Sequence, residues 1–357
     1  MTERRVLVWQ LGRRGAGPRI AVDLSDGIRS LGLFEVMLVL SDQAEILRSR
    51  TAPRDVLKLP TYRSVAGLVL RLMSAPWIMV RLNHLTNVLR PEMAIGAMPG
   101  PLDLFMMAAL QRTGTKTAII IHDAQRHPGD GYPFQMMLQT ALIQKADLLV
   151  TFSQHVATHL KNDPAARNKP ILALSHPPFI GTPSPAPFRH GGIPRLLMLG
   201  RLLPYKGLDL LAEALPRLSL PFTCRIIGQG PASPELARLA NLPTVEVQNR
   251  WVPEDELPDL VGWADVIILP YREASQSGIG AMAIASGRYV VATNVGGLVE
   301  QFADVPQAKL CTPESSSLAR TITDLLADPP RSQPAPQPEE SWAELGRHIL
   351  EKLASVS

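Results

Sequence analysis

Residues 6–18 read VLVWQLGRRGAGP, and the order of apolar residues, glycines and proline in this stretch indicates which fold to expect. The apolar start at 6–10 is typical of a buried strand, and the three glycines after it predict a tight turn. Pro18 then opens a helix whose apolar residues recur at helical spacing up to Gly32. A second apolar run at 36–40 completes a strand, helix and strand unit, which predicts a parallel sheet.

The same alternation continues along the chain and restarts after a stretch rich in Pro, Gly and Ser at 176–194. Further strands are predicted at 94–97, 117–121, 148–152, 196–199, 225–227, 245–247, 266–269 and 289–292. Helices are predicted at 102–110 and 342–353. We therefore expect two α/β domains at 1–178 and 195–338, a linker at 179–194, and a closing helix at 339–357 that packs back towards the first domain.

Composition narrows the class of protein. With 357 residues, of which 46% are hydrophobic and 19% charged, the chain is large enough for two folded domains and unlike a disordered protein. Its longest apolar candidate, residues 65–80, is broken by Arg71 and Pro76, so no bilayer-spanning helix is expected. Arginines among the first 20 residues argue against a signal peptide, which favours a cytoplasmic protein. Two cysteines without a Cys/His cluster predict neither a disulfide framework nor a metal site.

Positive charge gathers in the N-terminal half, where residues 1–180 carry 21 Lys and Arg against 13 Asp and Glu. The aromatic share of 5% and the lack of a recognised binding module disfavour nucleic acid as the partner. An anionic membrane surface or a phosphorylated substrate fits this charge better. Residues 68–82, which mix apolar side chains with arginines and Trp77, resemble a membrane-surface patch, and a core helix kinked at Pro76 is the alternative.

Residues 199–209, LGRLLPYKGLD, follow a predicted strand and open a helix. A glycine turn here places Arg201 and Lys206 near the carboxyl end of a parallel strand, where α/β folds bind their ligands. A guanidinium donates two parallel hydrogen bonds to a phosphate and an ammonium adds a point charge, so the two residues suit a diphosphate. A solvated turn, with Lys206 merely preceding a helix, is the alternative.

Residues 270–280, PYREASQSGIG, lie between a predicted strand and a predicted helix that continues to Gly287. Free backbone N–H groups at a helix start, with glycines permitting close approach, form an anion site. The alternative is that Ser275 or Ser277 is an ordinary helix N-cap.

These two segments, followed by residues 289–300 (YVVATNVGGLVE), resemble the GT-B-fold retaining glycosyltransferases of the large family 4. The resemblance covers most of the chain. It extends to residues 13–18, 121–123, 127–129, 228–231, 251–257 and 264–265 and to Ser153. It implies a GT-B fold, in which two Rossmann-like domains face each other across a cleft.

The resemblance also implies an activity and a role for each matching residue. A sugar would move from a nucleoside-diphosphate sugar, of UDP or GDP type, to a saccharide or lipid-linked saccharide with retention of configuration and without a metal or other cofactor. Arg201 and Lys206 match the cations on the donor diphosphate. His122 matches the residue beside the transferred sugar and Glu273 a sugar-facing carboxylate, with a structural histidine and an exposed loop carboxylate as the alternatives. The implied donor-binding residues are Gly200, Gly228, Ser275, Gln276, Ser277, Gly278 and Ile279, and the implied acceptor-binding residues are Arg14, Gly15, Gly17, Asp123 and His127.

One departure from the family pattern bears on the activity. Family members commonly carry two glutamates eight positions apart, and here the second is replaced by Ala281, counted from Glu273, or by Met282, counted from Ala274. We interpret the loss as an altered contact to the nucleotide ribose. It leaves open a non-catalytic GT-B-like assembly partner in polysaccharide synthesis, although the retained phosphate-binding cations favour an enzyme of exopolysaccharide or cell-envelope glycan synthesis, working at the inner face of the membrane. A nicotinamide-dependent dehydrogenase is disfavoured because the G-x-G of residues 15–17 lacks its third glycine.

Overall fold

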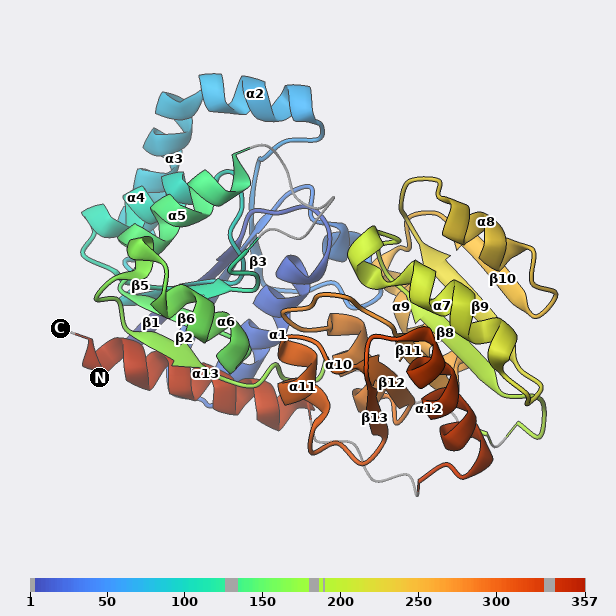
Figure 1. The fold of residues 1–357 in the computed structure, drawn as a ribbon. Coiled ribbons are helices and arrows are strands. Elements are labelled where there is room, and N and C mark those ends of the chain that lie inside the picture. The colour runs from blue at the N-terminus through green and yellow to red at the C-terminus, as the bar shows by residue number, and fades with distance from the viewer. Residues whose placement is uncertain (1–3, 126–133, 180–185, 189, 331–337, 357) are drawn as a thin grey trace. The chain divides into compact units, whose positions relative to one another are not determined.

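The computed structural model describes residues 4–125, 134–179, 186–188, 190–330 and 338–356 of the chain. These residues form two compact α/β units, each built on its own parallel sheet (Figure 1). Unit 1 gathers the described residues of 1–125, 132–175 and 339–357, and unit 2 gathers those of 176–338. The prediction of two Rossmann-like α/β folds is confirmed by this architecture.

Unit 1 contains a seven-stranded sheet in the order β3-β2-β1-β4-β5-β6-β7, with every neighbouring pair parallel. Its strands are β1 (Arg4–Gln10), β2 (Phe34–Ser41), β3 (Val56–Leu59), β4 (Met93–Gly96), β5 (Lys116–Ile121), β6 (Leu148–Thr151) and β7 (Ile171–Ala173). Its helices are α1 (Ala16–Ser30), α2 (Val65–Met73), α3 (Ala75–Leu89), α4 (Asp103–Arg112), α5 (Gln135–Lys145), α6 (Gln154–Lys161) and α13 (Pro338–Ser355), and its 3-10 turns are η1 (Glu45–Arg48) and η2 (Pro164–Ala166). Helices cover both faces of such a sheet, which is why its central strands are almost continuous apolar runs.

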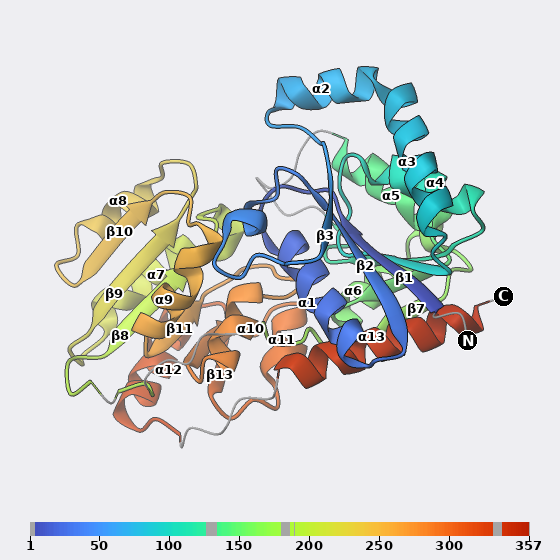
Figure 2. The same ribbon diagram turned by 180° about the vertical axis from the view of Figure 1, so that it is seen from behind.

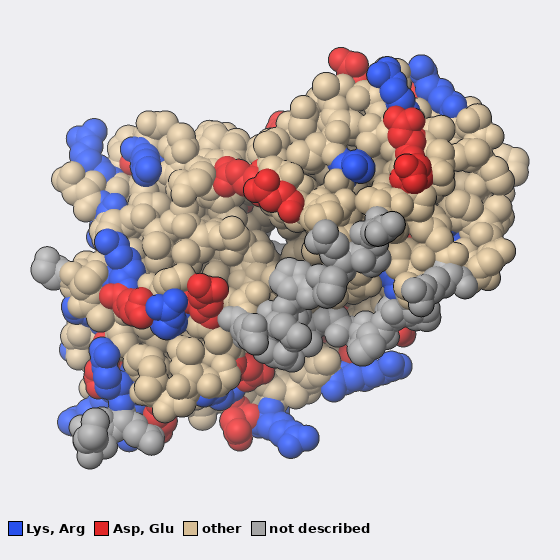
Figure 3. All heavy atoms as spheres, turned by 90° about the horizontal axis from the view of Figure 1, so that it is seen from below, with Lys and Arg blue, Asp and Glu red and all other residues tan. Residues whose placement is uncertain are grey.

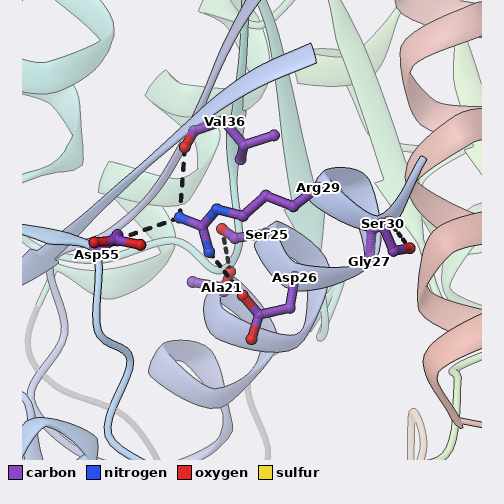
Figure 4. A network of polar contacts seen from close by, with 8 residues as sticks. All are labelled: Ala21, Ser25, Asp26, Gly27, Arg29, Ser30, Val36 and Asp55. Carbon is purple, nitrogen blue, oxygen red and sulfur yellow. Dashed lines mark hydrogen bonds and ion pairs between the residues drawn. The ribbon is translucent and has the colours of Figure 1, made fainter. Parts of the chain in front are cut away.

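A glycine-rich turn joins β1 to α1. The helix begins at Ala16, so Pro18 is its third residue rather than its first, and its missing N–H still falls in the first turn, where no hydrogen bond is lost. At the other end of α1, Arg29 donates to the Asp26 carboxylate at 2.7 Å and to the carbonyl oxygens of Val36 at 3.4 Å and Asp55 at 3.3 Å (Figure 4). These contacts fix the last turn of α1 against the start of β2.

The closing helix α13 belongs to unit 1 and runs along it in both views (Figures 1 and 2). Its buried side chains follow the helical spacing visible in the sequence: Trp342, Leu345, Ile349 and Leu353. A Cβ on Gly27 of α1 would lie 2.5 Å from the backbone of Trp342, so the glycine lets the two helices approach closely. Near the end of the chain, the Lys116 ammonium donates to the Ala354 carbonyl at 3.1 Å.

Helix α2 and the start of α3 project from the body of unit 1, whereas the rest of α3 packs against α4 (Figures 1 and 2). They are separated at Ser74, and Pro76 lies in the first turn of α3. Most large apolar side chains from α2 to the middle of α3 are exposed, whereas Leu68, Ile78 and Met79 pack against the core cluster, so the alternative of a core helix holds for one face of this segment only. Only Leu82 and Thr86 of α3 are buried. No helix in the described part of the chain is long and apolar enough to cross a membrane.

Unit 2 contains a six-stranded parallel sheet in the order β10-β9-β8-β11-β12-β13. Its strands are β8 (Arg195–Leu199), β9 (Thr223–Gly228), β10 (Val245–Asn249), β11 (Val266–Leu269), β12 (Tyr289–Thr293) and β13 (Ala308–Cys311). Its helices are α7 (Leu208–Ala214), α8 (Pro234–Ala240), α9 (Leu257–Trp263), α10 (Gly278–Ala285), α11 (Gly297–Phe302) and α12 (Ser315–Ala327), and its 3-10 turns are η3 (Pro204–Lys206), η4 (Leu215–Arg217) and η5 (Glu254–Glu256). One apolar cluster joins the sheet to the helices through residues such as Leu196, Leu211 and Ile322.

Candidate functional site

The strand order of unit 2 reverses between β8 and β11. From β8 the chain first moves to β9 and β10 on one side, and β11 to β13 follow on the other. The loops after β8 and β11 therefore diverge at the carboxyl edge of the sheet, which is where open α/β sheets bind ligands. The two segments singled out in the sequence, 199–209 and 270–280, are these two loops.

The loops after β8 and β9 are held together by backbone contacts. Gly200 donates to the Ile227 carbonyl at 3.1 Å, and Leu202 donates to the Gln229 carbonyl at 3.0 Å. A Cβ on Gly228 would lie 1.6 Å from the Gly200 carbonyl oxygen, so no larger residue fits at this crossing. Gly200 and Gly228, which were predicted to bind the donor, therefore also determine the shape of these loops.

The loop after β11 is fastened to the turn η3 in the same way. The Arg272 N–H donates to the Tyr205 carbonyl at 2.8 Å, and a Cβ on Gly207 would lie 1.7 Å from the Pro270 carbonyl oxygen. The Arg272 guanidinium also donates to both carboxylate oxygens of Asp209, from Nε at 3.2 and 3.0 Å and from Nη2 to Oδ2. Burial alone would raise the pKa of Asp209, but the hydrogen bonds and charge of Arg272 outweigh it and lower that pKa.

The cations of the first loop face aromatic rings. The Lys206 ammonium lies 3.6 Å from the centre of the Tyr271 ring and 5.0 Å from that of Tyr205. Arg201 is exposed, and its Nη2 donates to the Tyr205 hydroxyl at 3.3 Å. Within the described residues Lys206 forms no ion pair with a carboxylate. A half-buried ammonium on an aromatic face, without a counter-charge of its own, is a good binding group for an anion.

The start of α10 lies next to the same tyrosine. The Tyr271 hydroxyl is 3.4 Å from the Ser277 hydroxyl, which in turn accepts from the Gly280 N–H at 3.1 Å. Ser277 is therefore the N-cap of α10. The Ser277 N–H donates to the Gln301 side chain at 2.8 Å, whereas the N–H groups of Gly278 and Ile279 have no acceptor in the described structure.

Two contributors to this site were missed in the sequence. Tyr271 supports Lys206 and contacts the α10 cap, and Gln301 of α11 holds the loop by accepting from the Ser277 N–H and donating to its carbonyl at 2.9 Å. The position of Tyr271, directly after Pro270 at the end of a buried strand, was the available signal. Gln301 had none, because its contact joins residues 24 positions apart on separate elements.

The remaining predicted donor residues belong to the loop before α10. Glu273 is exposed, Ser275 is buried and Gln276 is partly buried. The two positions at which the second glutamate was sought, Ala281 and Met282, lie on α10 and are buried.

Unit 1 places its first group of predicted residues between β1 and α1. The Arg14 guanidinium lies 3.9 Å from the Glu45 carboxylate, and Gly15 adopts a φ of 84° with open space around its Cβ position. Gly17 is buried, and a Cβ there would lie 2.2 Å from the Gln10 amide nitrogen. Gln10 also donates to the Met98 carbonyl at 3.2 Å, which joins the loops after β1 and β4.

The second group of predicted residues in unit 1 follows β5. The His122 ring meets the Phe152 ring edge-on at 5.2 Å, and burial lowers the pKa of His122 to about 4, although the charge of Asp123 acts in the opposite sense. His122 is therefore neutral at pH 7. Gln139 of α5 donates to the Asp123 carbonyl at 2.7 Å. His127 lies outside the described residues.

The structure therefore gathers the predicted donor residues at one edge of the unit 2 sheet. The predicted acceptor residues are divided, because β4 lies between β1 and β5. Among the described residues, no three His, Cys, Asp or Glu side chains gather in a way that could hold a metal ion.

A family comparison finds a match in unit 2. Residues 193–328 match the family described as Glycosyl transferases group 1. The group 1 match contains every candidate donor residue from Gly200 to Ile279 and covers the sheet of unit 2. It ends before the Pro-rich stretch that precedes α13.

Individual proteins similar to this chain include glycosyltransferases from several bacteria. A GDP-mannose-dependent alpha-(1-6)-phosphatidylinositol monomannoside mannosyltransferase of Mycolicibacterium smegmatis is 32% identical over 55% of this chain and 57% of its own length. A 2-deoxystreptamine glucosyltransferase of Streptomyces kanamyceticus is 29% identical over 39% of this chain and 38% of its own length. The chain thus spans about half of the first relative and less of the second.

Among solved structures, Anabaena Alr3699/HepE in complex with UDP and glucose superimposes with a TM-score of 0.68 at 16% identity, covering 99% of this chain and 100% of that one. This likeness extends over both units and shows that they share the GT-B architecture.

Proposed function

We propose that this protein is a glycosyltransferase that moves a sugar from a nucleoside-diphosphate sugar to a saccharide or lipid-linked saccharide, with retention of configuration. One observation carries the proposal. The Lys206 ammonium, without a carboxylate partner in the described structure, lies on Tyr271, whose hydroxyl contacts the cap of α10. A cation and a helix start are thereby joined through one side chain at the switch point of unit 2, an arrangement that suits a diphosphate.

In the proposed reaction, negative charge develops on the departing nucleoside diphosphate. Arg201, Lys206 and the N–H groups of Gly278 and Ile279 would stabilise that charge, and preorganised donors of this kind commonly supply the largest part of a rate enhancement. Their positions are set before substrate binds, since Lys206 is supported by aromatic rings and α10 is capped by Ser277. Gly200, Gly228, Ser275 and Gln276 would shape the donor pocket around them. We propose no metal in this step.

We assign the sugar and the acceptor to the remaining predicted residues. His122, neutral at pH 7, would hydrogen-bond the transferred sugar as an uncharged ring, and Glu273 would face the same sugar. Arg14, Gly15, Gly17, Asp123 and His127 would contact the acceptor. Because Ala281 and Met282 are buried and apolar, the nucleotide ribose would be bound by other groups of unit 2.

The relatives favour a role in glycan or glycolipid synthesis. One is named for a GDP-mannose donor, and another was solved with UDP and glucose, so both bases remain candidates for this chain. We propose exopolysaccharide or cell-envelope glycan synthesis at the inner face of the cell membrane as its setting.

Thermal unfolding with UDP, GDP or ADP tests the donor site. A ligand at 100 times its Kd stabilises the folded protein by about 2.7 kcal/mol, so the matching nucleotide should raise Tm and the others should not. Lys206→Ala should abolish the shift, while Lys309→Ala, an exposed lysine of the same unit, should retain it. If no nucleotide shifts Tm, or if Lys206→Ala leaves the shift intact, the donor site is wrong.

A non-catalytic assembly partner is the second candidate, favoured by the replaced glutamate. Such a protein could bind a nucleotide sugar without turning it over. Release of UDP or GDP from the matching sugar nucleotide, in the presence of a membrane lipid extract, would separate the two, because only an enzyme releases nucleotide at a rate that depends on Lys206.

A further inference from the structure

We propose that α2 and the first half of α3 form a surface by which this protein binds an anionic lipid bilayer. The proposal deepens the proposed function by naming the surface that would bring the enzyme to a lipid-linked acceptor. It rests on unit 1 alone. Its test measures lipid binding without nucleotide, so its failure would be distinct from failure of the donor site.

The apolar side chains of this segment are unusually exposed. Thirteen large apolar side chains are exposed in the described structure, and six of them lie on α2 and the first half of α3: Val69, Leu70, Leu72, Met73, Trp77 and Val80. Met73 and Trp77, which flank the break between the two helices, are 77% and 79% exposed. Single exposed apolar residues are common, but a contiguous group of this size marks an interaction surface.

The segment folds without using these side chains. Ser64 caps α2 by accepting from the Gly67 N–H at 3.1 Å, and Arg71 of α2 donates to the Thr61 carbonyl at 2.7 Å. The later part of α3 buries Leu82 in the cluster that includes Met106 of α4. The helices are thus anchored by polar contacts and by one face of α3, which leaves the apolar surface free for a partner.

The charge of the segment selects the partner. Arg71 and Arg81 lie within the segment, Lys58, Arg63 and Arg90 lie on either side of it, and residues 56–91 contain neither Asp nor Glu. On the face that Figure 3 views, Lys and Arg lie beside Asp and Glu. Apolar and aromatic side chains combined with basic ones are typical of surfaces that lie in the headgroup region of an anionic bilayer. A second copy of the chain would bring like charges together, which makes it the weaker candidate.

Flotation with vesicles tests the surface. We expect the full chain to float with vesicles of phosphatidylcholine and phosphatidylglycerol at low salt, and to float several-fold less with phosphatidylcholine alone or in 0.5 M salt. The double variant Leu70→Ser, Met73→Ser should lose at least tenfold in partitioning. Leu33→Ser is the matched control, because Leu33 is 65% exposed against 67% for Leu70 but lies outside the segment. These variants change exposed residues, so their thermal unfolding should match that of the unaltered protein.

Two further measurements separate charge and insertion. Arg81→Glu should weaken binding to anionic vesicles several-fold, whereas Arg112→Glu, an exposed arginine of α4, should not. A blue shift of tryptophan emission on adding vesicles should disappear in Trp77→Phe. Equal flotation of the double variant and the Leu33→Ser control would overturn the proposal. So would a dimer in size-exclusion chromatography that the double variant dissociates while no form floats, since the surface would then bind a second copy.

Discussion

The two units have the same strand order around their switch points but use the adjoining loops differently. In unit 1 the arginines after β1 are engaged within the unit: Arg14 lies near Glu45, and Arg13 stacks on the Tyr62 ring at 4.9 Å and donates to the Arg63 carbonyl. In unit 2 the equivalent loop after β8 presents Lys206, which has aromatic neighbours but no carboxylate partner in the described structure.

The helices that follow β4 in unit 1 and β11 in unit 2, the strands across each switch point, differ in a similar way. In unit 1, α4 follows β4 and begins with the buried Asp103, whose carboxylate accepts from the Gly100 N–H at 2.9 Å. In unit 2, α10 follows β11 and begins with Gly278, whose N–H meets no acceptor among the residues that the structure describes. The Asp103 side chain fills the α4 start with an uncharged carboxyl group at pH 7, because burial raises its pKa to about 8, whereas a glycine leaves the start of α10 open to a ligand. The comparison teaches that the partners of the loop side chains and of the helix starts, rather than the fold, distinguish unit 1 from the unit that we propose binds a diphosphate.

The largest expected effect follows from removing a cation of the loop after β8. Lys206→Ala or Arg201→Ala should lower kcat by about 100-fold, as does the loss of one preorganised donor to developing charge. Arg14→Ala, in the equivalent loop of unit 1, should leave nucleotide affinity unchanged. Initial rates with saturating sugar nucleotide, together with nucleotide titrations, measure both. Unchanged turnover in both unit 2 variants, or weaker nucleotide binding in Arg14→Ala, would remove the distinction between the units.

The next largest effect is expected at two glycines, Gly15 before α1 in unit 1 and Gly207 between η3 and α7 in unit 2. Gly207 and Gly15 have φ values of 71° and 84°, but a Cβ on Gly207 would strike the Pro270 carbonyl oxygen while one on Gly15 would meet open space. Gly15→Ala should cost about 2 kcal/mol, because a φ of 84° with a ψ of −167° lies in a backbone region essentially confined to glycine. Gly207→Ala should cost more than about 2 kcal/mol, because the loop after β11 must also move.

Chemical denaturation gives the two free energies of unfolding, and a nucleotide titration adds the functional readout. Gly207→Ala should weaken nucleotide binding because it separates the loops that carry Lys206 and Tyr271. Equal losses of stability in the two variants would show that the contact between Gly207 and Pro270 is not tight in solution.

Much of the fold was predictable from the sequence, and the strands that were not predicted share one property. Every predicted strand is present, because central parallel strands are buried on both faces and appear as continuous apolar runs. The three strands that were missed, β3, β7 and β13, all lie at sheet edges. Their residues are mostly half-buried or exposed, so short sequences such as VLKL and AKLC carry little apolar signal.

The site residues that come soon after a buried strand were predictable from the sequence. Arg201 and Lys206 were found because a cation beside a glycine after a buried strand is visible in the sequence. The ring under Lys206 and the amide of Gln301 were missed, because these contacts join residues 65 and 24 positions apart. The exposure of α2 and α3 was left undecided for a similar reason, since an apolar helix has the same sequence pattern whether it is buried or waits for a partner.

The helix starts of the two units give the last pair of effects, and only the one at the buried Asp103 of unit 1 depends on pH. Burial raises the pKa of Asp103 to about 8, against the opposing hydrogen bond from Gly100, so the folded protein holds a proton that the unfolded chain releases near pH 4. This contribution to stability is fully present below about pH 4 and is lost as the pH rises to about 8, at about 1.4 kcal/mol per pH unit. Asp103→Asn should flatten that slope, because the amide oxygen still accepts from Gly100. Ser277→Ala at the unit 2 helix should instead cost about 1 kcal/mol at every pH, as the loss of an uncharged cap does. Denaturation at pH 6, 7 and 8 measures both, and an unchanged slope in Asp103→Asn would mean that the carboxylate is ionised and that the α4 start is satisfied by charge after all.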